Sequence, residues 1–291
     1  ARVVSFQDSD YPASLRDIHD APIVLYVQGK VPERIDVSLA IVGARKASLY
    51  GIEIAEAFAC RLAEFGIPVV SGLARGIDAA AHRGCLKAGG ETVGVLGCGL
   101  DIIYPLENKD LFEQIRRKGC VISEFPFGTL PVSFNFPRRN RIVSGLTLGT
   151  IVVEANIKSG ALITAEFALD QGKDVFAVPG RIDSSLSAGP LALIKQGAKV
   201  AASIEDILEE LPVKVVKAET ARKASMPAQG FSDEEKRIYT LIKDGVNTLE
   251  SLVGRTGLGV SSLLGPLLSL QLQRSIKEKP GKIYEILDPG A

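Results

Sequence analysis

The sequence predicts an α/β protein: a Rossmann-like open parallel sheet with helices on both faces, followed by a small winged-helix domain. Three observations favour this fold. Short, wholly apolar runs alternate with helix-like segments from residue 39 onward, and fully apolar strands are typical of a parallel sheet covered on both faces. The 29 glycines among 291 residues suit many tight turns between strands and helices. After residue 231, three helix-like segments precede a hairpin pattern.

The elements of the first part follow from these patterns. Residues 1–38 are expected to form a lead-in that packs on the core, with a buried strand in "APIVLYVQG". The core is expected over residues 39–211. Its strands are predicted at "LAIVGA", "PVVSG", "TVGVLG", "CVISEF", "GTIVVEA" and "DVFAVPG", and its helices at "SLYGIEIAEAFACRLAEFG", "GIDAAAHRGCLKAGG", "NKDLFEQIRRKG", "ALITAEFALDQG" and "GPLALIKQG". Such an open sheet binds its ligand beyond the carboxyl ends of its strands.

The end of the chain has a different pattern. Residues 212–230 are polar and aperiodic, which predicts a linker. Residues 231–291 are expected to form a winged-helix-like domain. Ser232 and Glu235 have the spacing of a capping box at its first helix. "NTLESLVGRTG" and "GVSSLLGPLLSLQLQRS" indicate two more helices, and "IKEKPGKIYEIL" indicates a hairpin that turns at Pro280 and Gly281.

Composition narrows the class of protein. The 34 basic and 34 acidic residues balance, so any anion site is a local patch on a neutral body. No apolar run reaches the roughly 20 residues of a membrane span, and we expect a cytoplasmic protein that does not contact membranes. The cysteines are separated and the histidines few, which favours buried thiols in a reducing compartment over disulfides or a metal site: Cys60, Cys85, Cys98 and Cys120, with His19 and His82.

Polar residues follow several of the predicted strands. Gly43, Arg45 and Ser48 come after the first core strand, and Arg75 comes after the second. Glycine turns that lead into helices present backbone N–H groups and the positive end of the helix dipole, which suit an anion. Each glycine could also be only a turn, and each arginine only a solvated charge. Neither GxGxxG nor GxxxxGK[ST] occurs, so we expect a phosphodiester ligand and no cofactor.

The stretch "NFPRRNRIVSG" (residues 135–145) concentrates charge and aromatic groups. Arginine forks bind phosphate oxygens, and neighbouring aromatic rings can stack on bases, which together predict a site for single-stranded nucleic acid. One of the arginines is expected instead to cap a helix that begins near Asn140 or to pair with Glu154. The residues concerned are Phe134, Phe136, Arg138, Arg139 and Arg141.

Catalytic groups are scarce. No nucleophile has a base and an orienting group in view, so we expect no catalytic residue and no enzyme. Asp78 and His82 are spaced i, i+4 on one predicted helix and can touch, which we interpret as a structural pair. Glu154 ends a strand and could be a base, but we expect it to accept hydrogen bonds from neighbouring backbone or from an arginine.

Several of these segments together resemble the DprA/Smf family of DNA-processing proteins. The motifs are "VGARKASLYG", "SGLARGIDAAAH", "GCGLDIIYPLEN", "ISEFPFG", "FPRRNRIVSGL", "VVEANIKSGALITAEFAL" and "FAVPG". The resemblance covers about Ser5 to Ala202, with a looser match in the tail. The chain departs from the family pattern at Ala44, where the family usually has Ser or Thr, and at Ala161, where it usually has Ser.

The resemblance implies a core that binds single-stranded DNA, forms a homodimer, and loads the RecA recombinase onto DNA coated by single-strand binding protein, in natural transformation and recombination. It also implies no enzymatic activity. Leu191 and Ile194 in "GPLALI" are our candidate dimer contacts. Carried over by position, the DNA site would use Gly43, Arg45, Ser48, Arg75, Lys109, Phe134, Arg138, Arg139 and Asn140.

Other functions stay open at the level of the sequence. A nucleoside-phosphate hydrolase with a related core would also use a glycine turn, an arginine and a strand-end glutamate, but its "PGGxGTxxE" segment is missing, and "GALITAE" stands in the similar place. A module that senses a nucleotide is the third hypothesis. The candidate recognition helix of the winged-helix domain has no charge before Arg274, whereas helices that read DNA present polar side chains to the grooves. For this domain we therefore favour a protein contact or an accessory role.

Overall fold

The computed structural model describes residues 1–211, 232–272, 275–279 and 282–286. The chain forms two compact units, residues 1–218 and 219–291. The linker predicted at 212–230 lies outside the described residues. Within the described residues, no helix is both long and apolar enough to cross a membrane.

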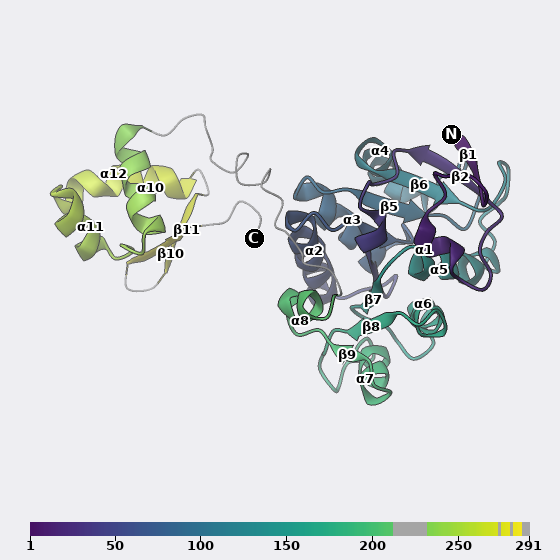
Figure 1. The fold of residues 1–291 in the computed structure, drawn as a ribbon. Coiled ribbons are helices and arrows are strands. Elements are labelled where there is room, and N and C mark those ends of the chain that lie inside the picture. Colours follow the sequence, from purple (N-terminus) through teal and green to yellow (C-terminus); the bar gives the residue numbers. More distant parts are fainter. Residues whose placement is uncertain (212–231, 273–274, 280–281, 287–291) are drawn as a thin grey trace. The chain divides into compact units, whose positions relative to one another are not determined.

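The first unit is built on a nine-stranded sheet (Figure 1). The strand order is β1-β2-β6-β5-β4-β3-β7-β8-β9, and neighbours from β6 to β9 pair in parallel. The predicted Rossmann-like fold class is thereby confirmed. The strands are β1 (Arg2–Ser5), β2 (Val24–Gly29), β3 (Leu39–Val42), β4 (Val69–Ser71), β5 (Thr92–Val95), β6 (Cys120–Ser123), β7 (Gly149–Val152), β8 (Asp174–Ala177) and β9 (Lys199–Val200).

Two strands of the lead-in extend this sheet at one edge. β2 pairs antiparallel with β6, and β1 pairs antiparallel with β2. The strand predicted in "APIVLYVQG" corresponds to β2. β1 was not predicted, because Val4 is its only fully buried residue and its apolar signal is therefore weak.

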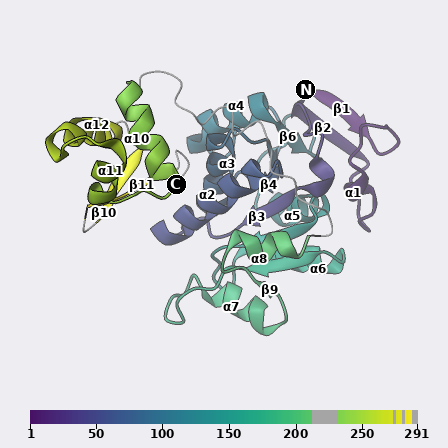
Figure 2. The same cartoon turned by 60° about the vertical axis from the view of Figure 1, so that its left-hand side comes forward.

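Helices cover both faces of the sheet, as Figure 2 shows for α2 and α3 on one of them. The reason is visible in β3, where Ala40 and Val42 belong to one buried cluster while Leu39 and Ile41 belong to another. Alternate side chains of a strand point to opposite faces, so a strand that is apolar throughout needs cover on both. The helices of this unit are α1 (Ala13–Arg16), α2 (Leu49–Glu64), α3 (Ile77–Lys87), α4 (Lys109–Lys118), α5 (Asn135–Gly145), α6 (Gly160–Asp170), α7 (Ala188–Lys195) and α8 (Ile204–Glu209).

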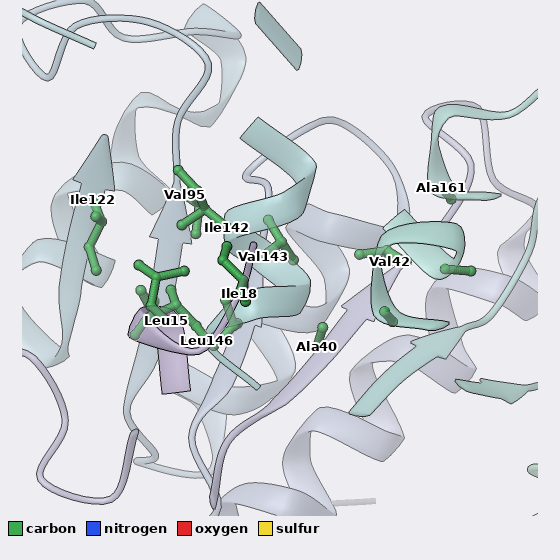
Figure 3. Close-up of a cluster of buried hydrophobic side chains, with 14 of the residues drawn as sticks. Leu15, Ile18, Ala40, Val42, Val95, Ile122, Ile142, Val143, Leu146 and Ala161 are labelled. Atoms are coloured by element: carbon green, nitrogen blue, oxygen red, sulfur yellow. The ribbon is translucent and has the colours of Figure 1, made fainter. Parts of the chain in front are cut away.

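Helix α5 contains the whole arginine-rich stretch. It begins at Asn135, five residues before the predicted start near Asn140. The prolines around it obscured the start, yet Pro137 lies in the first turn, where a missing N–H group costs no helical hydrogen bond. The inner face of α5 carries Ile142 and Val143, which pack in one buried cluster with Leu15 and Ile18 of the lead-in (Figure 3).

The order of the sheet fixes where a ligand can bind. From β3 the chain proceeds through β4 and β5 to β6 on one side, and then crosses to β7, β8 and β9 on the other side. β3 and β7 are neighbours, so the loops after them diverge to opposite sides of the sheet. A crevice opens at such a switch point, beyond the carboxyl ends of the strands.

The second unit has the elements of a winged helix: α10 (Asp233–Lys243), α11 (Leu249–Thr256), α12 (Val260–Leu272), β10 (Ile276–Lys279) and β11 (Ile283–Ile286). The capping box is confirmed, since the Ser232 hydroxyl accepts from the Glu235 N–H group at 3.2 Å and the Glu235 carboxylate accepts from the Ser232 N–H group at 2.6 Å. The antiparallel pairing of β10 and β11 confirms the hairpin. Its predicted turn at Pro280 and Gly281 lies outside the described residues.

Candidate nucleic-acid interface

A cavity of about 670 Å³ lies at the switch point, which we call the strand-end cavity. A smaller pocket of about 160 Å³, the side pocket, shares one wall with it. Arg45, Phe136 and Arg139 line both of them. Other polar and aromatic residues that line the strand-end cavity are Lys46, Asp78, Tyr104, Ser133, Asn140, Asn156, Lys158, Ser159 and Thr164.

Two glycines bring the turns around the cavity together. A Cβ atom at Gly43 would lie 2.5 Å from the Ile77 side chain and 2.8 Å from the Glu154 carbonyl oxygen. Gly76 has φ +73°, and a Cβ atom there would lie 2.2 Å from the Ala44 carbonyl oxygen. Only glycine fits at such separations. The turn after β3 therefore lies directly against the turn before α3, and Arg45 projects from this junction.

Ser48 and Glu154 hold the start of α2. The Ser48 hydroxyl accepts from the Gly51 N–H group at 3.1 Å and donates to one Glu154 oxygen at 2.6 Å. The other Glu154 oxygen accepts from the Ser48 N–H group at 2.9 Å. The expectation that Glu154 accepts hydrogen bonds from neighbouring backbone is confirmed.

Arg45 is presented to the cavity on an aromatic platform. Its guanidinium carbon lies 5.0 Å from the centre of the Phe136 ring. The Phe136 ring in turn packs on Tyr104, with a centroid distance of 5.4 Å and an interplanar angle of 32°. Stacking orders the guanidinium and leaves its N–H donors at the edge of the stack for an anion.

The arginines of α5 have three different environments. Arg139 is 4% exposed and donates to the carbonyl oxygens of Gly72, at 2.5 Å, and of Val95. Arg141 is equally buried and pairs with Glu124 at 2.6 Å. Arg138 is exposed and lies 3.4 Å from the same carboxylate.

The sequence predicts that one of the three arginines has a structural role, whereas in the structure both Arg139 and Arg141 make buried contacts within the protein. The predicted pairing with Glu154 was wrong, since Arg141 pairs with Glu124. Arg139 forms the floor of the cavity, where burial lowers the pKa of its guanidinium to about 10. The nearby Asp78 carboxylate partly opposes that shift, and burial raises the pKa of Asp78 itself.

The remaining predicted residues are spread around the site. Asn140 lines the cavity and donates to the Gly160 carbonyl oxygen at 3.0 Å. Arg75 lines the side pocket and pairs with Glu107. Lys109 is exposed at the start of α4, and Phe134 is 75% exposed outside the lining residues. Contacts of all these residues with DNA stay predictions.

Sequence reasoning passed over several residues that line the cavity. The DNA site carried over from the family names Phe134 and omits Phe136, whereas in the structure it is Phe136 that lines the cavity and packs on Arg45 and Tyr104. Lys46 and Lys158 each precede a helix N-terminus at a strand end, so the rule used for Arg45 would have found them. Tyr104 reaches the cavity from the loop after β5. Its segment is one of the family motifs, but Tyr104 itself is not among the predicted site residues.

Asp78 and His82 do not form the expected pair. Asp78 accepts from the Ala74 N–H group at 3.3 Å, and His82 lies 2.7 Å, through Nδ1, from the Thr92 hydroxyl. That hydroxyl donates to the Val69 carbonyl oxygen at 2.7 Å, so it accepts from His82 Nδ1–H. Burial, reinforced by Arg139 and Arg83, lowers the pKa of His82 to about 3, and the imidazole is therefore neutral at pH 7.

A pH dependence of stability follows from His82. The unfolded chain binds a proton at His82 near pH 6.5 and the folded chain only near pH 3, so stability is full above pH 6.5 and falls as the pH drops between these values. From pH 7 to pH 5 the expected loss is about 2 kcal/mol. Urea unfolding at both pH values should show it in the wild type and not in His82→Leu. An equal loss in both proteins would contradict the assignment, because the other groups titrate alike in the two.

The first unit is thus a Rossmann-like protein with a cationic, aromatic cavity at its switch point, and the second unit is a winged helix. Residues 2–212 match the family described as DNA recombination-mediator protein A, and residues 222–282 match the DprA winged helix domain. The chain belongs to the DprA/Smf family, as the sequence motifs predicted.

Individual relatives agree with this assignment. DNA processing protein DprA of Streptococcus pneumoniae is 45% identical over 206 residues, which cover 71% of this chain and 73% of that protein. Protein Smf of Escherichia coli is 38% identical over 275 residues, covering 93% and 74%. Family members are recombination mediators that process DNA.

Two solved structures of the family have the same fold. The structure of Streptococcus pneumoniae DprA matches with a TM-score of 0.70 and 43% identity, over 73% of this chain and 75% of that one. A structure of Helicobacter pylori DNA processing protein A, which addresses its binding of single-stranded DNA, matches with a TM-score of 0.64 and 28% identity, over 72% and 94%.

Proposed function

We propose that this chain binds single-stranded DNA in the strand-end cavity and acts as a recombination mediator. The arrangement of Arg45 on the stacked rings of Phe136 and Tyr104 carries the proposal, because it offers a phosphate-binding cation and base-stacking surfaces in one place. Lys46 and Lys158 add charge at the cavity wall. The Helicobacter pylori relative, studied for its binding of single-stranded DNA, supports it further.

Binding of this kind is electrostatic and independent of base sequence. Affinity for a labelled oligo-dT of about 30 nucleotides should fall with salt, by a slope of about −0.7 per neutralised phosphate. Fluorescence anisotropy across a salt series measures both quantities. Mixed-sequence DNA should bind within a few-fold of oligo-dT. Binding that ignored salt, or tight binding of a mononucleotide without binding of the oligonucleotide, would contradict the proposal and favour the nucleotide-sensing hypothesis.

The finer functional proposal is that the protein loads RecA onto DNA coated by single-strand binding protein, in natural transformation, in the cytoplasm and without catalysis of its own. The family match supports the mediator role. The cysteines suit a reducing compartment, since all four are free and buried. Assembly of RecA filaments on coated single strands, with and without this protein, tests the loading step.

We also propose a homodimer that forms through α7. Leu191 and Ile194 are half-buried on this helix, and Ile194 packs against the core. Leu191→Asp should therefore shift the sedimentation of the protein toward the monomer while leaving its fold intact. Leu169→Asp, at an exposed position on the neighbouring α6, is the matched control.

For the winged-helix unit we propose a protein contact. Helix α12 exposes Val260, Leu264 and Leu268 in one row, at spacings of four residues, while Leu263 and Leu267 face its own core. An uncharged row of this kind does not complement a phosphate backbone. It suits an apolar partner surface instead.

A further inference from the structure

Arg75, which lines the side pocket, is paired with an acidic side chain in this structure. Tyr104 and Pro105 line one wall of this pocket, and the chain continues from them into a short 3-10 helix (Leu106–Asn108). Arg75 lines the same pocket from the loop after β4. Its guanidinium lies 2.5 Å from the Glu107 carboxylate. A carboxylate therefore occupies Arg75, one of the residues predicted to contact a DNA phosphate.

A separate set of hydrogen bonds holds together the two segments that carry this ion pair. The side-chain amide of Asn108 donates to the carbonyl oxygens of Leu73, at 3.0 Å, and of Ala74, at 3.3 Å. Leu73 is fully buried with φ +55°, a left-handed conformation that a leucine rarely adopts. Asn108 thus clamps the loop that carries Arg75 to the segment that carries Glu107, one residue away from each charge.

The pair itself remains exchangeable. Arg75 and Glu107 are 62% and 61% exposed, and ion pairs in water contribute little to stability. A phosphate that approaches Arg75 can therefore displace the carboxylate without disturbing the fold, because the clamp at Asn108 does not depend on the two charges.

We infer that Glu107 is an internal competitor of DNA: its carboxylate occupies Arg75 in the free protein and is exchanged for a phosphate when a strand binds. This inference rests on the proposed function. It adds that Glu107 lowers the affinity for single-stranded DNA and makes the dependence of that affinity on salt less steep. When the exchange occurs, the freed carboxylate recruits a cation from solution, which offsets part of the counterion release that accompanies phosphate neutralisation.

The test is a double-mutant cycle, read by oligo-dT anisotropy across a salt series, with wild type, Glu107→Gln, Arg75→Ala and the double variant. Glu107→Gln should tighten binding by about three- to tenfold at low salt and steepen the salt slope by up to about 0.7. In the Arg75→Ala background the same substitution should have a much smaller effect. Glu56→Gln is the matched control, because Glu56 pairs with Arg83 at 3.1 Å outside both cavities.

The outcomes separate cleanly. If Glu107→Gln weakens binding, Glu107 positions Arg75 rather than competing for it, and the inference is overturned. It is also overturned if the effect of Glu107→Gln equals that of Glu56→Gln, or persists undiminished without Arg75, since it would then be general charge repulsion. If neither the wild type nor any variant binds, the proposed function fails and the inference with it.

Discussion

Arg139→Ala is expected to lower the free energy of unfolding by about 3–5 kcal/mol, the range for a buried charge that loses its partner. The guanidinium bonds to the carbonyl oxygens of Gly72 and Val95, which follow β4 and end β5, and it lies in the field of the buried Asp78 carboxylate. Its removal leaves these oxygens without a donor and Asp78 without a counter-charge. Urea unfolding of the wild type and the variant measures the difference.

The neighbouring residue provides the control for this prediction. Arg138 is 53% exposed by its side chain, and its ion pair with Glu124 is long, at 3.4 Å. Arg138→Ala should therefore change stability by no more than about 1 kcal/mol, as exposed ion pairs do. If Arg138→Ala and Arg139→Ala were equally mild, the interpretation of Arg139 as a structural residue would be wrong.

Arg45→Ala is expected to do the opposite: stability is kept and binding of single-stranded DNA is weakened. Arg45 is exposed, and its main contact is with the Phe136 ring. Removal of one phosphate contact and of the order in the stack should weaken binding at low salt by about 1–3 kcal/mol, which is roughly 5- to 150-fold. The salt slope should become shallower by about 0.7.

Two further variants locate this effect. Phe136→Ala removes the platform without removing a charge, so it should weaken binding and leave the salt slope close to that of the wild type. Arg117→Ala removes an exposed arginine of α4, outside the cavity lining, and is the control for net charge. Equal losses in Arg45→Ala and Arg117→Ala would place the DNA somewhere other than the strand-end cavity.

The comparison of these arginines shows how far the sequence can predict such a site. Each of the six core strands that apolar runs and glycine turns predict is present in the structure, as β3 to β8. These strands are predictable because both signals are local. The cluster in α5 also lies at the strand-end cavity, which Arg139 and Asn140 line. The roles of its individual arginines depend on contacts that are distant in the chain. Arg139 is buried because it donates to the carbonyl oxygens of residues 72 and 95, and nothing near residue 139 encodes those contacts.

The same limit applies to the wall of the side pocket. Arg75 was predicted from its place after a strand, and Lys109 from the family resemblance. Glu107 and Asn108, which directly precede Lys109, are not among the predicted residues, because their partners are more than 30 residues away in sequence. A short segment such as Leu106–Asn108 carries no periodicity from which its contacts could be inferred.

The packing of the lead-in against α5 bears on how this chain can be shortened. A Cβ atom at Gly145 would lie 2.7 Å from Leu15, so the end of α5 fits closely against the helix at residues 13–16. Lys173 donates to the carbonyl oxygens of Ser144 and Gly145 at the end of α5. A protein begun at residue 39 would retain every residue that lines the cavity, yet it would expose the apolar face of α5 that packs on the lead-in. Such a fragment should aggregate or be digested quickly by proteases, so a trimmed version for crystallisation or for use as a DNA-binding reagent has to keep its first residues.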